Sequence, residues 1–423
     1  MRVSVLPESV ETVVVGAGHA GLSMSSLLRT AGREHLVVER RSTLGGGWQD
    51  RWDEFRLVSP NWTASFPGYT YDGDDADGFM PRDEIIERVA RYADVIDAPV
   101  ALDTRVERLE AHRDGGRRFR LTTSRGHVLA DRVIVATGGF QVPRISPAAA
   151  GLSERVWQVH AHEYRSEAAL PPGAVLLVGT GQTGVQLAEE LHRAGRRVFL
   201  SVGRCGRAPR RYRGRDTFHW LAGVKVRGHQ YGTSLPTVET LPDPRLRFAC
   251  NPHLSGHRGG HDTNLRQFAA EGMTLVGRFE AADGERIRLA ADLNANLDFA
   301  DRFFDARLKP IFDTYIERSG AEAGPDDRPP ALIRDVPEVT ELDLAAEGIS
   351  TILWTSGFRL DYGWIDLPIF EPNGVPRQVD GLTEIPGLAF VGLPWMRDMA
   401  SATLFGVGRD AAIVADRLEA ARA

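Results

Sequence analysis

Three glycines and one glutamate near the N-terminus have the types and the spacing that bind a dinucleotide. Gly16, Gly18 and Gly21 form a GxGxxG turn that follows a β-branched run over 12–15 and opens an expected helix. Such glycines let the backbone approach a pyrophosphate, and the helix N-terminus offers free N–H groups to it. Glu39 follows the next apolar strand, where a carboxylate accepts the ribose hydroxyls. A glycine-rich turn without a ligand is the alternative, but the complete strand–turn–helix–strand–acid pattern favours a dinucleotide site.

The same pattern occurs a second time in the middle of the chain, with one difference. Gly179, Gly181 and Gly184 follow a second apolar run and open a second expected helix. Val202, which is not an acid, stands at the position equivalent to Glu39. The second segment therefore predicts a second dinucleotide site with a different charge preference.

Arginines follow the second turn where the first turn has its acid. A guanidinium pairs bidentately with a 2′-phosphate, which an acid would repel, so these arginines favour NADP over NAD. The alternative is a solvated loop. The arginines are Arg204, Arg207, Arg210, Arg211 and Arg213, of which we take Arg204 and Arg211 as the candidate phosphate contacts.

Composition restricts the class of protein. The 423 residues, 42% of them hydrophobic and 26% charged, are typical of a folded chain of two or three domains. The net charge of −6 argues against a nucleic-acid partner. Only two cysteines occur, Cys205 and Cys250, without CxxC spacing, which argues against a disulfide scaffold, a cysteine zinc cluster and a dithiol redox centre.

Targeting signals and a metal site are also not expected. No apolar run approaches the ~20 residues that span a bilayer, and no signal peptide is visible, so we expect a cytoplasmic location without membrane contact. His253, His257, His261 and Asp262 raise the possibility of a metal site, but the proline and glycines among them oppose a shared helix face. We predict no metal there and a loop that shapes the cofactor or substrate mouth.

The remaining elements must position these sites. Turns at 114–116 and 125–126 predict a three-stranded meander that runs into a buried strand over 132–136. Another strand is expected over 387–393 and a final helix over 407–421. An amphipathic helix over 294–316, interrupted by Pro310, and a linker over 320–330 are expected before them.

The chain resembles the FAD- and NADPH-dependent flavin-containing monooxygenases, which include N-hydroxylating and Baeyer–Villiger relatives. Besides the two glycine turns, the resemblance rests on the segments 45–48 (GGGW), 136–138 (ATG) and 355–357 (TSG). It implies an α/β fold with two dinucleotide-binding domains. A Rossmann-like FAD domain, 1–165 and 356–423, would carry a Rossmann-like NADPH domain, 166–355, as an insertion.

The resemblance also assigns residues. A family fingerprint, FxGxxxHxxx(Y/F/W), matches at His160 and Tyr164, whereas Glu154 and Val156 replace its phenylalanine and glycine. Asn61 falls where the family places an asparagine beside the flavin; the alternative is a turn-forming residue after proline. These three are the candidate catalytic residues. Further cofactor contacts are expected at Trp48, Thr137, Gly138, Ser356, Gly357, Gly392 and Leu404.

The resemblance implies an enzyme that forms a C4a-(hydro)peroxyflavin. It would transfer one oxygen atom from O2 to a small organic substrate, at nitrogen or sulfur. A Baeyer–Villiger reaction on a ketone is one alternative, although Tyr164 stands where those relatives have tryptophan. An NADPH oxidase or reductase and a non-catalytic flavin-binding regulator are the others.

Overall fold

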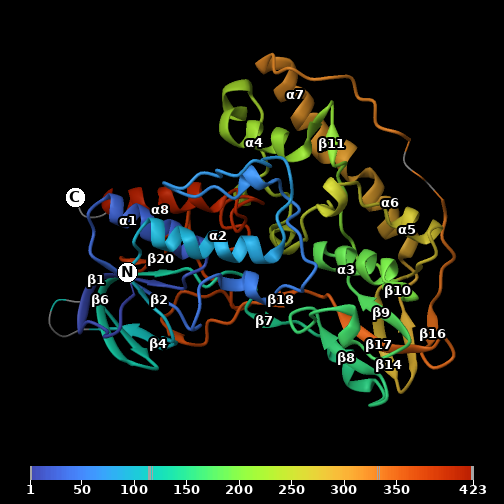
Figure 1. The fold of residues 1–423 in the computed structure, drawn as a ribbon, viewed down its shortest axis with the longest axis horizontal. Coiled ribbons are helices and arrows are strands. Elements are labelled where there is room, and N and C mark those ends of the chain that lie inside the picture. The colour runs from blue at the N-terminus through green and yellow to red at the C-terminus, as the bar shows by residue number, and fades with distance from the viewer. Residues whose placement is uncertain (1, 113–115, 117, 331, 333, 421–423) are drawn as a thin grey trace.

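Two sheets, joined by two crossing segments, organise the chain. The computed structural model describes residues 2–112, 116, 118–330, 332 and 334–420 (Figure 1). The first sheet has the order β19-β4-β5-β6-β1-β2-β3, with β20 also paired to β6. Its strands are β1 (Ser9–Val15), β2 (His35–Val38), β3 (Val100–Ala101), β4 (Val106–Ala111), β5 (Phe119–Thr123), β6 (Gly126–Val135), β19 (Ile365–Asp366) and β20 (Leu388–Phe390).

The first sheet is parallel around β1, and helices cover it. β1 pairs in parallel with β2 and β6, and its side chains Val13 and Val14 are fully buried. Near-continuous apolar runs are what a parallel strand covered on both faces requires. The helices α1 (His19–Thr30), α2 (Arg82–Val95) and α8 (Val407–Ala420) lie side by side on one face (Figure 1).

The expected meander is present in the first sheet. β4, β5 and β6 pair in antiparallel order, and Gly126 follows the turn between the last two. Residues 114 and 115 of the other expected turn lie outside the described residues, as does residue 421 of the final helix. Sequence periodicity therefore predicted this part of the fold well, because each turn joins neighbouring strands.

The second sheet is entirely parallel and carries the second glycine turn. Its order is β13-β10-β9-β17-β8, with α3 following β9. A small antiparallel sheet, β14-β15-β16, packs beside it. The elements are β8 (Trp157–His160), β9 (Ala174–Val178), α3 (Gln182–Arg193), β10 (Val198–Ser201), α5 (Leu265–Ala270), β13 (Thr274–Val276), β14 (Phe279–Asp283), β15 (Arg286–Leu289), β16 (Glu341–Asp343) and β17 (Ile349–Trp354).

A helical lobe stands apart from both sheets at one end of the molecule (Figure 1). It comprises residues 208–235 and 303–323 and has its own core around Tyr212, Trp220 and Phe312. Pro310 follows a π-helical turn, Phe304–Leu308, which joins α6 to α7 and interrupts the regular hydrogen-bond ladder where the proline has no N–H to donate. The elements are β11 (Arg211–Tyr212), β12 (Arg215–Asp216), α4 (Thr217–Arg227) and α7 (Lys309–Ser319), with α6 (Leu293–Phe303) leading into the lobe.

The crossing segments show where the second domain is inserted. β7 (Val142–Pro143) and β18 (Phe358–Arg359) pair with each other between the two sheets. β8 lies before residue 166, where we expected the second domain to begin, yet it pairs with β17 of the second sheet. We therefore propose that the inserted domain spans about 144–357.

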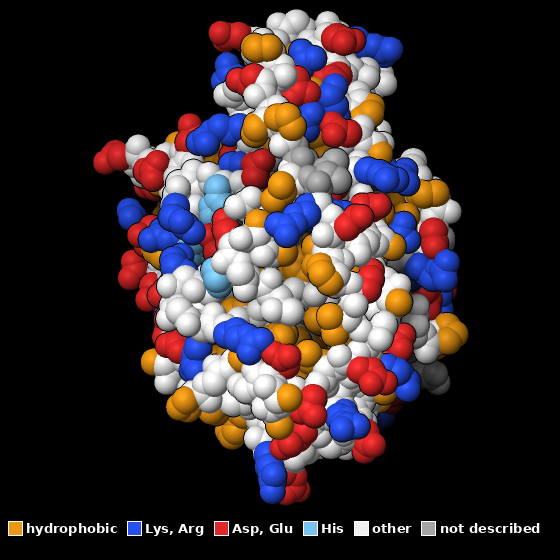
Figure 2. Space-filling model, turned by 90° about the vertical axis from the view of Figure 1, so that its right-hand side faces the viewer, with side chains coloured by type: hydrophobic (Ala, Val, Ile, Leu, Met, Phe, Trp, Pro, Cys, Tyr) orange, Lys and Arg blue, Asp and Glu red, His pale blue; other side chains and the backbone are white. Residues whose placement is uncertain are grey.

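The surface mixes charges of both signs. In Figure 2, Lys and Arg side chains are interspersed with Asp and Glu around a central group of hydrophobic side chains. The arginines are thus spread over this face rather than gathered into one patch. Among the described residues, no helix has the length and apolar content needed to cross a membrane.

Candidate cofactor and active site

The first glycine turn is built so that only glycine fits at two of its positions. Gly16 has a φ of +107°, and a Cβ atom there would lie 2.7 Å from the carbonyl oxygen of Ala136. A Cβ atom at Gly21 would lie 1.8 Å from the carbonyl oxygen of Gly16. The strand end at Ala136, which leads into Thr137 and Gly138, therefore packs directly against the turn.

Glu39 closes this first turn from the end of β2. Its Oε2 accepts a hydrogen bond of 2.8 Å from the Ala17 N–H, and its Oε1 accepts one of 3.0 Å from the Arg41 N–H. The side chain is buried within the protein but lines a large cavity. A carboxylate held in this way faces the position at which a ribose would lie.

The second turn repeats the same backbone construction. Gly179 has a φ of +111°, and its Cβ would lie 2.9 Å from the carbonyl oxygen of Thr355. A Cβ atom at Gly184 would lie 2.1 Å from the carbonyl oxygen of Gly179. The hydroxyl of Thr355 donates a hydrogen bond of 2.6 Å to the same Gly179 oxygen. The segment 355–357 thus supports this turn as 136–138 supports the first.

A hydroxyl replaces the carboxylate in the second turn. Thr180 Oγ1 accepts a hydrogen bond of 2.9 Å from the Gly203 N–H. Arg204 follows, exposed at the cavity, with its Cζ atom 4.3 Å from the centre of the Phe299 ring. In the described part of the chain, no carboxylate lies within ion-pair distance of Arg204. The other predicted phosphate contact, Arg211, is exposed in β11 and does not line the cavity.

Three neighbouring arginines have structural partners instead. Arg207 pairs with Asp301 at 2.8 Å, and Arg213 pairs with Asp313 at 3.1 Å. Arg210 is buried and pairs with Asp216 at 2.6 Å. Of the five arginines after the second turn, Arg204 alone lines the cavity.

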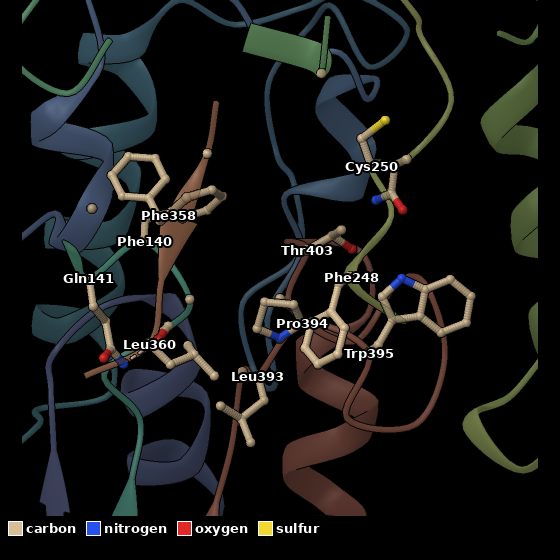
Figure 3. Close-up of a pocket in the computed structure, with 18 of the residues that line it drawn as sticks. Phe140, Gln141, Phe248, Cys250, Phe358, Leu360, Leu393, Pro394, Trp395 and Thr403 are labelled. Atoms are coloured by element: carbon tan, nitrogen blue, oxygen red, sulfur yellow. Dashed lines mark hydrogen bonds between the residues drawn. The ribbon is translucent and has the colours of Figure 1, made fainter. Parts of the chain in front are cut away.

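One cavity of about 2400 Å³ is shared by the two turns. Figure 3 shows Phe140, Phe358 and Leu360 on one wall and Phe248, Cys250, Pro394 and Trp395 on the opposite wall. Apolar walls of this kind exclude water from a reacting centre. The predicted cofactor contacts Gly16, Gly18, Glu39, Trp48, Thr137, Gly138, Gly179, Gly181, Arg204, Ser356, Gly357, Gly392 and Leu404 all line the cavity, whereas Gly21, Gly184 and Arg211 do not.

His160 lies at the cavity, at the end of β8, with both ring nitrogens engaged. Its Nε2 donates a hydrogen bond of 3.0 Å to the carbonyl oxygen of Gly357, and its Nδ1 accepts one of 3.1 Å from the His162 N–H. Burial lowers the pKa of His160, which keeps the ring neutral. The imidazole therefore fastens the segment that returns to the first domain.

Tyr164 and Asn61 do not line the cavity. The Tyr164 hydroxyl donates a hydrogen bond of 2.9 Å to Glu190 of α3, and burial raises the pKa of Glu190 to about 7. The Asn61 Nδ2 donates to the carbonyl oxygen of Asp75 at 2.8 Å, and its Oδ1 accepts from the Met80 N–H at 2.6 Å. These placements give the two predicted catalytic residues structural partners outside the cavity, Glu190 of α3 for Tyr164 and the 75–80 loop for Asn61.

Comparisons with known proteins agree with this geometry. Residues 13–215 match a family described as pyridine nucleotide-disulphide oxidoreductase. An uncharacterized CzcO-like oxidoreductase of Geobacillus kaustophilus is 30% identical over 404 residues, which cover 95% of this chain and 96% of that protein. A probable indole-3-pyruvate monooxygenase, YUCCA3 of Arabidopsis thaliana, is 25% identical over 217 residues, 49% of each chain. The chain belongs to the CzcO-like oxidoreductases.

A solved structure shows the same fold. A flavin-containing monooxygenase from Stenotrophomonas maltophilia matches with a TM-score of 0.66 and 21% identity, over 99% of this chain and 100% of that chain. The predicted α/β fold with two dinucleotide-binding domains is therefore confirmed, as is the family resemblance. The chain is an enzyme, an oxidoreductase.

Sequence reasoning missed Arg51 of this oxidoreductase. Its side chain lines the cavity, with Cζ 4.5 Å from the Phe140 ring centre and 5.7 Å from that of Phe55. Burial lowers the pKa of Arg51 to about 10. The aromatic residues that flank it in sequence, Trp48 and Trp52, are the one signal that pointed to this place.

The two cysteines form a pair that the sequence analysis did not predict. Cys205 and Cys250 form a disulfide, with their Cα atoms 6.0 Å apart. The sequence did not predict this pair because the two residues are 45 positions apart and only the fold of the intervening segment brings them together. The pair lies at the second glycine turn, since the Cβ of Cys250 would be 3.8 Å from a Cβ atom at Gly181.

The histidines of the same segment have separate partners. His253 is fully buried, and its Nε2 lies 2.5 Å from the carbonyl oxygen of Thr180 in the second turn. His261 pairs with Glu189 of α3 at 3.1 Å. No group of three or more metal-ligating side chains that could hold an ion occurs among the residues that the structure describes. The segment borders the cavity, where we expected it to shape a cofactor or substrate mouth.

Proposed function

We propose that this enzyme is an NADPH-dependent flavin monooxygenase that uses FAD. It transfers one oxygen atom of O2 to a small organic substrate at nitrogen or sulfur. The observation that carries the proposal is the single cavity into which both glycine turns open, with the Glu39 carboxylate at one and, at the other, the Arg204 guanidinium, which has no ion-pair partner among the described residues. Such an arrangement brings a flavin and a nicotinamide into one chamber.

The first turn fits FAD. At Gly16 and Gly21 the turn has no room for a Cβ atom, and Gly18 lets the backbone before α1 approach a pyrophosphate at the N-terminus of the helix. Glu39 would accept the ribose hydroxyls, and Thr137 and Gly138 line the same side of the cavity. Leu404 lies in the turn segment that precedes α8, and this segment also lines the cavity.

The second turn fits NADPH. Thr180 and Gly181 offer backbone to a pyrophosphate, and Arg204 is free to pair with a 2′-phosphate. The Phe299 ring holds the Arg204 guanidinium in place, which lowers the entropy lost on binding. NADH lacks the phosphate that this arginine would bind, so the site discriminates against it.

The chain itself then positions and shields the reacting groups. When bound, the two cofactors supply the hydride and the activation of oxygen. The aromatic residues Phe140 and Phe358 wall the chamber against water, and neutral His160 holds the Gly357 segment at its edge. Because this chemistry belongs to the cofactors, it does not require a catalytic triad or a nucleophilic cysteine in the chain. Nitrogen and sulfur are the proposed targets because their lone pairs attack electrophilic oxygen.

The test begins with the purified protein and FAD under anaerobic conditions. We expect NADPH to bleach the flavin absorbance much faster than NADH does. Isotopically labelled O2 is then added with a panel of amines and thioethers, and mass spectrometry should find a product that contains one labelled atom. Equal rates with the two nucleotides would overturn the NADPH assignment. Hydrogen peroxide release without labelled product across the panel would overturn the oxygen transfer.

A further inference from the structure

A covalent bond ties a surface segment to the second glycine turn. Cys205 follows Arg204 directly, and its disulfide partner Cys250 lies against Gly181. Beyond Cys250 the chain is fastened to the same turn by polar contacts. Gln182 Nε2 donates to the Leu254 carbonyl oxygen at 2.5 Å, and its Oε1 accepts from the Leu254 N–H at 3.1 Å. The disulfide is thus part of the wall of the nucleotide site.

The two sulfur-bearing residues differ in exposure. Cys250 is exposed and lines the cavity, across from Phe140 and Phe358 (Figure 3). Cys205 is only 3% exposed, and its Sγ lies 3.4 Å from the carbonyl oxygen of Asn251. After reduction the Cys205 thiol would donate a hydrogen bond to that oxygen, so the reduced pair has a place in the structure. An external thiolate can approach Cys250 but not Cys205.

The first turn has no disulfide beside it and therefore serves as a comparison for the second. Opposite Gly18 lies the backbone of Gly46, whose Cα is 3.9 Å from a Cβ atom built at Gly18. Opposite Gly181 the corresponding neighbour is the Cys250 side chain, at 3.8 Å. The two distances are alike, but Gly46 has no side chain, whereas Cys250 continues into a sulfur atom that the bond to Cys205 holds in place.

We propose that Cys205–Cys250 is a thiol-exchange site, through which a dithiol reductant opens the NADPH site that the proposed function assigns to the second turn. In the oxidised enzyme the cystine narrows the space over Gly181 and weakens nucleotide binding. In the reduced enzyme Cys250 moves away, and the nucleotide binds more tightly.

The exchange balances in two steps. A thiolate of the dithiol attacks the Cys250 sulfur, the bond between the two cysteine sulfurs breaks, and Cys205 leaves as a thiolate that takes a proton from water. The second thiol of the reductant then displaces Cys250 and closes its own disulfide. Two electrons pass from the dithiol, which is oxidised, to the cystine, which is reduced to two thiols.

The contacts around Cys250 limit how much of the chain can move after the disulfide is reduced. Residues 245–251 are exposed or half-buried, and Phe248 is 58% exposed. Their remaining polar contacts to the rest of the protein include the Arg247–Glu371 ion pair at 2.8 Å and a long 3.5 Å bond from Asn251 to Met399. Buried His253 and the Gln182–Leu254 pair keep the next residues in place. Movement is therefore confined to the short segment that carries Cys250.

The experiment measures NADP+ binding to the full chain by titration calorimetry, with and without prior dithiothreitol. Mass spectrometry after thiol alkylation counts free cysteines in each sample. Wild type should show no free thiol before reduction and two after it, and the reduced form should bind NADP+ roughly tenfold more tightly. Cys250→Ser should bind like the reduced form in both conditions. Cys205→Ser, which leaves Cys250 free, is the matched control and should also be insensitive to dithiothreitol.

The outcomes separate this inference from the proposed function. Equal NADP+ affinity of oxidised and reduced wild type would overturn the exchange site and leave the proposed function intact. Two free thiols in the untreated protein, even after mild oxidation, would overturn it as well. If neither form binds NADP+, the assignment of the second turn fails, and the exchange site fails with it.

Discussion

The two glycine turns have the same backbone construction but differ in the side chains that would face a ligand. In both, the first and third glycines sit where a Cβ atom would strike a carbonyl oxygen, and a strand end from later in the chain supports the turn. Gly16 rests on Ala136 and Gly179 rests on Thr355. The construction is the same because the task of presenting N–H groups to a pyrophosphate is the same.

The differences begin at the end of the second strand. Glu39 binds the Ala17 N–H in the first turn, whereas the Thr180 hydroxyl binds the Gly203 N–H in the second. Both arrangements close the turn, so the closure does not require a charge. This freedom lets the second turn carry Arg204 where the first carries an acid. Cofactor selectivity can therefore change without rebuilding the turn.

The largest expected effect comes from filling the third glycine of either turn. Gly21→Ala and Gly184→Ala place a methyl group 1.8 Å and 2.1 Å from backbone oxygens, which must shift at a cost of about 3 kcal/mol. We expect Gly21→Ala to lose bound flavin, and Gly184→Ala to keep flavin while it loses NADP+ binding. The flavin-to-protein absorbance ratio and an NADP+ titration measure the two effects. Loss of both cofactors in both variants would show that the turns are not independent.

Arg204 tests the charge difference directly. Arg204→Ala removes the proposed pair with the 2′-phosphate, and hydrogen bonds to charged groups contribute about 1.5–3 kcal/mol. We expect kcat/KM for NADPH to fall roughly 10- to 100-fold while that for NADH changes little. Arg211→Ala is the matched control, because Arg211 does not line the cavity. A similar loss with both nucleotides would contradict the assignment.

The helices that follow the two turns, α1 and α3, differ in the side chains that they bury. α1 packs Leu27 against the core, whereas the equivalent position of α3 holds Glu190, whose carboxyl group accepts a hydrogen bond from Tyr164. Burial raises the pKa of Glu190 from 4.5 to about 7, so the folded chain holds a proton that the unfolded chain releases. The free energy of unfolding therefore declines as pH rises from about 4.5 to 7.

Glu190→Gln should remove this decline and leave the variant more stable than wild type above pH 7, by about 1–3 kcal/mol. Chemical denaturation at several pH values measures the difference, and Tyr164→Phe serves as the control that removes the hydroxyl partner but keeps the acid. Parallel stability curves for wild type and Glu190→Gln would refute the pKa argument.

The smallest effect is expected at Thr180, whose hydroxyl closes the second turn as the Glu39 carboxylate closes the first. Thr180→Val removes the hydrogen bond to Gly203 while it keeps the shape of the side chain. We expect a loss of about 1 kcal/mol in stability and a modest rise in KM for NADPH. Thermal unfolding and initial rates measure them. An effect as large as that of Gly184→Ala would mean that closure of the second turn does depend on this bond.

Sequence reasoning succeeded where the signal is local. Glu39 directly follows β2, as expected, and the glycines of both turns lie where their spacing placed them. It was less successful for side chains that act across the fold. Asn61 and Tyr164 match family positions, yet both are occupied with structural partners away from the cavity. Arg211 is close to Arg204 in sequence but does not line the cavity, because after Arg204 the chain turns into the β11–β12 hairpin of the helical lobe, which contains Arg211.

By itself, the sequence determined the two turns, the acid of the first and the guanidinium of the second. These features depend on backbone conformation and on residues a few positions apart, which short-range sterics set. Tertiary structure alone decided that both turns open into one cavity, that Arg51 lies among aromatic rings there, and that Cys205 meets Cys250. Those outcomes depend on how distant segments pack, and no local pattern of residue types specifies that packing.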